Sequence, residues 1–234
     1  MSLPVAILAG GMATRLGPIT EAIPKSLVEV AGRPFAEHQV ELLRAHGISD
    51  VVWLVAHRAD QIEGALGDGS RWGLRFAYAH DGPTLLGTGG AVKRALSQLG
   101  DAFFVMYGDS YLECDFADVE RMFRASGHAG LMTVYGNDGR YDTSNVEFEE
   151  GRIRQYDKNA RTPAMRHIDW GLGVLTPRAF ARYRSDEPLD LATVYQDLLA
   201  TDNLTGYLVP NRFYEIGSPD GIRDTDAYLR TRPR

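Results

Sequence analysis

Strand-like and helix-like patterns alternate along the first half of this 234-residue chain. Continuous or alternating apolar runs predict strands at residues 5–8, 51–56, 74–80 and 102–107. Apolar positions at helical spacing predict helices at residues 35–46, 60–66 and 88–99. This order of strand and helix predicts an α/β fold, with a Rossmann-like, mostly parallel mixed sheet and helices on both faces.

The second half has shorter and more varied elements. Strands are predicted at residues 129–135 and 171–176, with a hairpin at residues 145–158 that turns at Glu150 and Gly151. Helices are predicted to start at Pro177 and to cover residues 189–200 and 218–230. Because the chain contains no repeat, low-complexity tract or linker, we expect a single domain over residues 1–234.

Two turns follow directly after predicted strands and contain glycine. Gly10-Gly11 comes after the strand at residues 5–8, and Gly108-Asp109 comes after the strand at residues 102–107. In open α/β sheets, ligands bind beyond the carboxyl ends of the strands. We therefore expect one pocket to contain both turns.

The first of these turns has the chemistry of a phosphate-binding loop. Gly10 and Gly11 let the backbone approach a bulky anion, and Arg15 and Lys25 add positive charge. The spacing matches neither the G-x-G-x-x-G fingerprint nor the Walker A motif. A nucleoside triphosphate fits these residues; the alternative is an ordinary strand-to-loop turn whose basic residues face solvent.

The same stretch resembles the signature of the sugar-1-phosphate nucleotidyltransferases, L-A-G-G-x-G-T-R-L-x-P-x-T followed by x-P-K and a later proline. It is present here as Leu8, Ala9, Gly10, Gly11, Met12, Ala13, Thr14, Arg15, Leu16, Gly17, Pro18, Ile19 and Thr20, then Pro24, Lys25, Gly32 and Pro34. Ala13 replaces the third glycine of the pattern. The resemblance implies a glycosyltransferase-A-like fold, with a nucleotide-binding half at about residues 1–110 and a sugar-phosphate-binding half at about residues 111–234.

The resemblance also implies the nucleotide and metal ligands. Nucleotide contacts are expected from Leu8, Ala9, Gly10, Gly11, Thr14, Arg15, Leu86, Gly87 and Thr88. Asp109 matches the family's metal-binding aspartate, and Glu215 stands where a second aspartate is usual. Mg²⁺ or another divalent cation is the expected cofactor, because it is held by one or two carboxylates plus phosphate oxygens. The alternatives are turn capping by Asp109, N-capping of a helix by Thr88 and a helix-dipole contact by Glu215.

Four residues are expected at the sugar phosphate by the same resemblance: Gly108, Lys158, Asp169 and Gly171. Trp170 beside them could stack on a sugar, although packing is the commoner role of tryptophan. Arg15, Lys25 and Asp109 are the expected catalytic residues. Arg15 would contact the leaving pyrophosphate, and Lys25 the region of the α-phosphate.

Composition and charge limit the kinds of binding partner that we expect. The net charge of −6 and the lack of a long basic run argue against nucleic acid, and no apolar stretch reaches the ~18 residues of a membrane span. Cys114 is the only cysteine, which suits a reducing cytoplasm, and no secretory signal is visible at the N-terminus. Small-molecule substrates are the expected partners, and a homo-oligomer is left open.

The implied reaction is direct transfer of a nucleotidyl group to a sugar 1-phosphate, which gives an NDP-sugar and pyrophosphate. The residues 85–91 and 214–220 look most like those of small guanylyltransferases acting on heptose or mannose 1-phosphate, which favours GTP. Uridylyl- and cytidylyltransferases of the same frame remain alternatives. A non-catalytic nucleotide-sugar-binding paralogue is a further alternative, favoured by Ala13 and Glu215. A plain NTP hydrolase would lack an evident water-activating residue.

Overall fold

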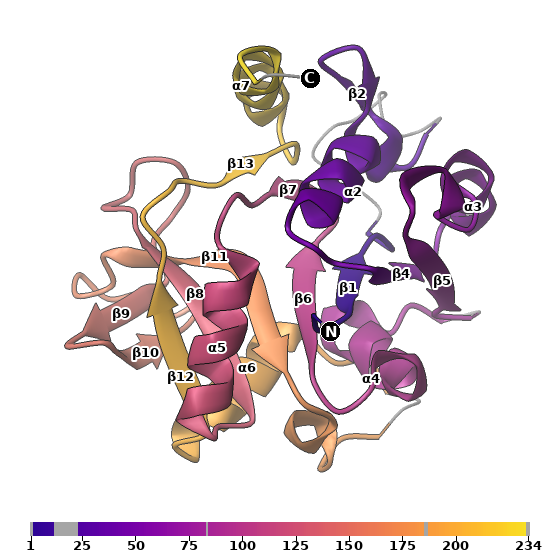
Figure 1. Ribbon diagram of the computed structural model, residues 1–234. Helices are drawn as coiled ribbons and strands as arrows, with labels where there is room; N and C mark the ends of the chain where they lie inside the picture. Colours follow the sequence, from indigo (N-terminus) through magenta and orange to yellow (C-terminus); the bar gives the residue numbers. More distant parts are fainter. Residues whose placement is uncertain (1, 12–22, 83, 185–186, 233–234) are drawn as a thin grey trace.

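The computed structural model describes residues 2–11, 23–82, 84–184 and 187–232 (Figure 1). Thr14 and Arg15, two of the expected nucleotide contacts, and Ala13 lie outside these ranges. Within them, one mixed sheet is formed by nine strands: β1 (Val5–Leu8), β4 (Asp50–Val55), β5 (Arg75–His80), β6 (Phe103–Tyr107), β8 (Gly130–Gly136), β9 (Val146–Glu149), β10 (Arg152–Tyr156), β11 (His167–Leu175) and β12 (Leu204–Leu208).

Helices and short strands surround this sheet. In the described ranges the α-helices are α2 (Phe35–Ala45), α3 (Ala59–Leu66), α4 (Gly87–Leu99), α5 (Phe116–Ser126), α6 (Leu191–Ala200) and α7 (Pro219–Arg230). The short elements are η2 (Lys25–Leu27), β2 (Glu29–Val30), β3 (Arg33–Pro34), η3 (Ser70–Trp72), β7 (Ser110–Tyr111), η4 (Pro177–Phe180) and β13 (Tyr214–Glu215). No helix in the described part of the chain is long and apolar enough to cross a membrane.

The strand order confirms the predicted fold. Strands β6, β1, β4 and β5 are adjacent and parallel, whereas β11 runs antiparallel to β6 and continues the sheet into the second half of the chain. Beyond β11 the sheet divides, because β8 and β9 both pair with it, and β12 adds in parallel to β8. Strands from both halves of the sequence therefore share one continuous sheet.

Two apolar cores lie on opposite faces of the sheet. Val5 and Ile7 of β1 pack in the core that contains α2, α3 and α5, whereas Ala6 packs in the core that contains α4 and α6. Figure 1 shows α5 in front of the sheet and α6 behind it. Because the central parallel strands are covered on both faces, they read as unbroken apolar runs rather than as alternating ones.

The second half departs from the sequence-based prediction at three elements. Strand β11 begins at His167 rather than at residue 171, because its register shifts between Asp169 and Gly173 and this interrupts the pattern. Helix α5 and strand β12 were not predicted. Helix α5 has a visible signal in the spacing of its buried residues Phe116, Val119 and Phe123, whereas β12 contains Gly206 and is mostly half-exposed at the sheet edge.

A buried glutamine fixes the turn after β6. Gln39 of α2 is fully buried, and its Nε2 donates to the carbonyl oxygens of Tyr107 (3.1 Å) and Ser110 (2.8 Å). These two carbonyls flank Gly108 and Asp109 on either side. One side chain therefore holds both ends of the turn against the neighbouring helix.

Replacing Gln39 by leucine should lower the free energy of unfolding by about 2–4 kcal/mol, because a buried and a partly buried carbonyl group lose their donor. Urea denaturation followed by circular dichroism would measure the change. Gln98→Leu, on the exposed face of α4, is the control and should change the stability by no more than about 0.5 kcal/mol. Equal effects of the two substitutions would contradict this role of Gln39.

Candidate functional site

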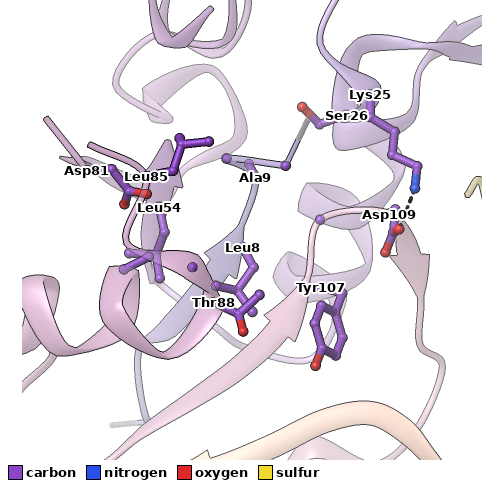
Figure 2. Close-up of a pocket in the computed structure, with 15 residues that line it drawn as sticks. Leu8, Ala9, Lys25, Ser26, Leu54, Asp81, Leu85, Thr88, Tyr107 and Asp109 are labelled. Carbon is purple, nitrogen blue, oxygen red and sulfur yellow. Dashed lines mark hydrogen bonds and ion pairs between the residues drawn. The ribbon is translucent and has the colours of Figure 1, made fainter. Parts of the chain in front are cut away.

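A pocket of about 290 Å³ opens at the carboxyl ends of β1, β4 and β6 (Figure 2). Residues from the first glycine turn, η2, the end of β4, the segment before α4 and the turn after β6 line it. They are Leu8, Ala9, Gly10, Gly11, Lys25, Ser26, Leu54, Asp81, Leu85, Gly87, Thr88, Ala91, Tyr107, Gly108 and Asp109. The expected meeting of the two glycine turns in one pocket is confirmed.

One end of the pocket carries opposite charges. The Lys25 ammonium lies 2.6 Å from Oδ2 of Asp109, and the Ser110 hydroxyl lies 3.1 Å from Oδ1 of the same carboxylate. The two charged side chains keep 20% and 32% of their surface exposed, so both can be reached from the pocket. A cation and a carboxylate thus stand together where strand ends and a glycine turn meet.

The glycine before Asp109 is required by close packing. The Gly108 N–H donates to the Leu8 carbonyl oxygen (3.0 Å), and a Cβ on Gly108 would come within 2.7 Å of that oxygen. Gly11 differs, since a Cβ there would meet no atom of the described residues within 4 Å. Gly108 therefore sets the position of β6 against β1, while Gly11 leaves open space beside the backbone.

The other end of the pocket is apolar apart from one carboxylate. Leu54, Leu85 and Ala91 contribute hydrocarbon, and Asp81 follows directly after β5. Asp81 is buried, and its Oδ2 accepts a hydrogen bond from the Leu86 N–H (3.1 Å). Burial raises the pKa of this carboxyl group, while the Leu86 N–H and the charge of Arg94 oppose the rise.

The glycine-rich start of α4 packs against the segment before α6. The N–H groups of Gly89 and Gly90 donate to the Leu189 carbonyl oxygen (2.8 and 3.1 Å). Thr88 does not cap its own helix: α4 has no side-chain cap, and the Thr88 hydroxyl accepts from the Leu191 N–H at the start of α6 (2.9 Å). The N-cap alternative for Thr88 is therefore wrong, and these groups join the two halves of the chain.

A second group of polar residues lies next to Tyr107. The half-buried side chain of Asp169 accepts from the Tyr156 hydroxyl (3.2 Å) and from the Gly171 N–H (3.1 Å). Burial raises the pKa of Asp169, and the positive charge of Lys158 opposes the rise. The Lys158 ammonium reaches the Tyr107 hydroxyl at 3.4 Å, and Tyr107 also lines the pocket. Of the residues expected at the sugar phosphate, Lys158 thus contacts the pocket-lining Tyr107, and Asp169 and Gly171 are joined to each other.

Glu215 lies on the strand next to the turn of Asp109, with its carboxylate turned to α7. Its position in β13 is opposite Ser110 of β7, and the Ile216 N–H donates to the Asp109 carbonyl oxygen (2.9 Å). The carboxylate accepts from the Gly217 N–H and from the Ser218 hydroxyl (2.9 Å). Among the described residues, no group of three or more acidic, histidine or cysteine side chains forms a metal cluster.

Most of the expected nucleotide contacts that the structure describes are brought together. Leu8, Ala9, Gly10, Gly11, Gly87 and Thr88 line the pocket. Two of the expected catalytic residues, Lys25 and Asp109, also line it, as does Gly108, which was expected at the sugar phosphate. Leu86 does not line it; this side chain is buried beneath, and Leu85 is the exposed neighbour that does. The sequence analysis missed Asp81, Tyr107 and Ser26, although Asp81 follows a predicted strand in the same way as Asp109.

Known proteins share this sequence pattern and fold. The family model described as nucleotidyl transferase matches residues 5–228. The chain is 33% identical over 186 residues to a glucose-1-phosphate thymidylyltransferase of Streptomyces antibioticus, covering 78% of this chain and 52% of that protein. It is 30% identical over 232 residues to the mannose-1-phosphate guanylyltransferase catalytic subunit beta of Xenopus tropicalis, covering 96% and 64%. The chain thus spans about half to two thirds of the length of these curated relatives.

Solved structures match over nearly the whole chain. A Bacillus anthracis protein solved in complex with a sucrose has a TM-score of 0.89 at 20% identity, covering 100% of this chain and 97% of that one. HddC from Yersinia pseudotuberculosis, complexed with GMP-PN, has a TM-score of 0.79 at 22% identity, covering 97% and 99%. At these identities the matches establish the fold. The match of the family model over residues 5–228 shows that this chain belongs to the nucleotidyl transferase family.

Proposed function

We propose that this protein transfers a nucleotidyl group from a nucleoside triphosphate to a sugar 1-phosphate, releasing pyrophosphate and an NDP-sugar. The observation that carries the proposal is the Lys25–Asp109 pair at the polar end of a pocket whose other end is apolar apart from Asp81. The apolar end suits a nucleobase and the charged end suits phosphates. Relatives named for sugar-1-phosphate thymidylyl and guanylyl transfer support the same class of reaction.

The chemistry needs charge and alignment more than proton transfer. A sugar-1-phosphate oxygen is already an anion, so it can attack the α-phosphorus in line without a general base. The barrier comes from repulsion between two polyanions and from the geometry of attack. Lys25 offsets charge near the α-phosphate, and the N–H groups of the Gly10-Gly11 turn orient the phosphates. From the sequence, Arg15 is proposed at the leaving pyrophosphate.

Asp109 fits a divalent cation. Its carboxylate follows the end of β6, is partly exposed to the pocket and offers hard oxygen atoms beside the site proposed for the phosphates. When bound, Mg²⁺ would supply positive charge that stabilises the pentavalent transition state. We propose Glu215 as the second carboxylate, from the adjacent strand; to reach the ion it would leave its bonds to Gly217 and Ser218.

The second polar group is proposed to hold the sugar phosphate. Lys158 supplies the positive charge for the phosphate, and the Asp169 carboxylate supplies acceptors for sugar hydroxyls. Gly171 has φ 99°, and a Cβ there would come within 3.5 Å of the Tyr107 ring, so glycine keeps the strand surface open beside Tyr107. Because Lys158 contacts the Tyr107 hydroxyl and Tyr107 also lines the pocket, the proposal has the two substrates on either side of the Tyr107 ring.

GTP with a heptose or mannose 1-phosphate is the substrate pair that we propose, on the resemblance of residues 85–91 and 214–220. Uridylyl or cytidylyl transfer in the same frame, and nucleotide-sugar binding without turnover, are the competing functions. The first test is pyrophosphate release from GTP, UTP, CTP, ATP or dTTP with Mg²⁺ and a panel of sugar 1-phosphates. Release that requires both substrates is expected. Release from a nucleotide alone would indicate a hydrolase, and binding without release a non-catalytic paralogue.

Asp109→Asn should reduce turnover by roughly 100-fold or more, because the metal would lose its anionic ligand. The rate of pyrophosphate release at saturating Mg²⁺ measures the effect. Asp101→Asn, at an exposed position before β6, is the matched control and should keep the wild-type rate. Near-normal turnover of the Asp109→Asn protein would rule out the metal assignment.

Lys158→Gln should raise the KM for the sugar 1-phosphate about 10- to 100-fold, because one charged hydrogen bond to phosphate is lost. The KM for the nucleotide should stay within about twofold, since Lys158 lies beyond Tyr107 from the nucleotide end. Steady-state kinetics with each substrate varied in turn separates the two. Arg152→Gln, on the exposed side of the same hairpin, serves as the control. An equal rise in both KM values would contradict a role confined to the sugar phosphate.

A further inference from the structure

Asp81 is a buried carboxylate inside a pocket that is otherwise apolar at that end. The residue is 7% exposed and stands among Leu54, Leu85 and Ala91. Its place is fixed by the backbone, because the Asp81 N–H donates to the Val55 carbonyl oxygen (3.1 Å) and extends the pairing of β5 with β4. A charge in such surroundings is costly unless hydrogen-bond donors compensate it.

The protein itself supplies few of those donors. Within the described part of the chain, the Asp81 side chain makes one hydrogen bond, from the Leu86 N–H to Oδ2. An ionised carboxylate has about four acceptor sites. Arg94 acts on this carboxylate through its charge, and no ion pair between the two side chains is found among the described residues. The carboxylate therefore keeps acceptor capacity that faces the pocket.

The arrangement of charged and apolar groups in the pocket favours one orientation of a bound nucleotide. Figure 2 shows Lys25 and Asp109 at one end and Asp81, Leu54 and Leu85 at the other. Phosphates belong with the Lys25 ammonium and the backbone of Gly10 and Gly11. The flat, weakly polar base then lies between the leucine side chains, and its hydrogen-bonding edge meets Asp81.

We propose that the Asp81 carboxylate selects guanine as the base of the nucleoside triphosphate, an inference that rests on the proposed function. The guanine edge carries two adjacent donors, N1–H and the 2-amino group, which a carboxylate accepts together. Uracil and thymine place one N–H between two carbonyl oxygens, and these would repel the carboxylate. Cytosine and adenine offer one amino group beside an acceptor nitrogen. Guanine alone matches an acceptor-only partner.

A purely structural role of Asp81 predicts a different result for the Asp81→Asn protein. If Asp81 served only to hold the Leu86 N–H, asparagine would replace it, because the amide oxygen accepts the same bond and has nearly the same shape. An amide also adds a donor, which suits a pyrimidine carbonyl and conflicts with the guanine donors. Asp81→Asn therefore separates base selection from support of the loop.

The experiment measures kcat/KM for GTP, ITP, UTP and dTTP with the sugar 1-phosphate that gives turnover. ITP lacks only the 2-amino group of GTP. The wild-type protein should prefer GTP over ITP and over dTTP by roughly tenfold or more each. In Asp81→Asn, kcat/KM for GTP should fall about 10- to 100-fold, the GTP preference over ITP should shrink, and dTTP should be unchanged or improved. Asp101→Asn should show the wild-type profile.

The outcomes separate this inference from the proposed function. Turnover with a wild-type preference for dTTP or UTP, or equal use of GTP and ITP, overturns the guanine assignment and leaves the transferase intact. The ITP comparison needs no variant, so it stands even if Asp81→Asn fails to fold. If no substrate pair releases pyrophosphate, calorimetric binding of GTP, ITP and dTTP to the wild-type protein decides the base. Tightest binding of GTP would then support Asp81, and equal binding would reject it.

Discussion

The central constraint on this protein is that its parallel strands are buried on both faces. Strands β1, β4 and β6 have apolar side chains packed against helices on either side, so they cannot slide or tilt without opening one of the two cores. Their carboxyl ends are therefore held at one edge of the sheet. The glycine turns, Leu54, Asp81 and Asp109 reach the pocket because they lie at or just after strand ends, and η2 and the start of α4 complete it with Lys25 and Thr88.

Much of this arrangement was predictable from the sequence because its signals are local. Apolar runs locate the central strands, and the glycine turns after them locate the pocket, including Lys25 and Asp109. Contacts between residues that lie far apart in the sequence were not predictable in the same way. Thr88 reads as a helix cap, yet its hydroxyl accepts from Leu191, which lies 103 residues along the chain. Leu85 and Leu86 are neighbouring leucines that the sequence pattern does not distinguish, and only the path of the backbone decides which of them is buried.

The Lys25–Asp109 pair has a modest role in stability. Both side chains are partly exposed, and such pairs contribute roughly 0–1 kcal/mol. Its significance lies in preorganisation, because each charge holds the other at the pocket before any substrate arrives. The Gln39 bonds to the carbonyls of Tyr107 and Ser110 are less accessible and fix the backbone of the same turn. The turn thus combines a backbone held by Gln39 with a Lys25–Asp109 contact that substrates can replace.

The packing of α4 against the segment before α6 has a consequence for how substitutions are tolerated. A Cβ on Gly87 would come within 2.8 Å of the Leu189 carbonyl oxygen, and one on Gly89 would come within 3.0 Å of the Asp190 carbonyl carbon. A side chain at Gly87 would clash with the backbone of Leu189, and one at Gly89 would be crowded by Leu189 and Asp190, whatever is bound nearby. A glycine-rich stretch beside a ligand site can thus be under selection for the joint between two halves of a fold.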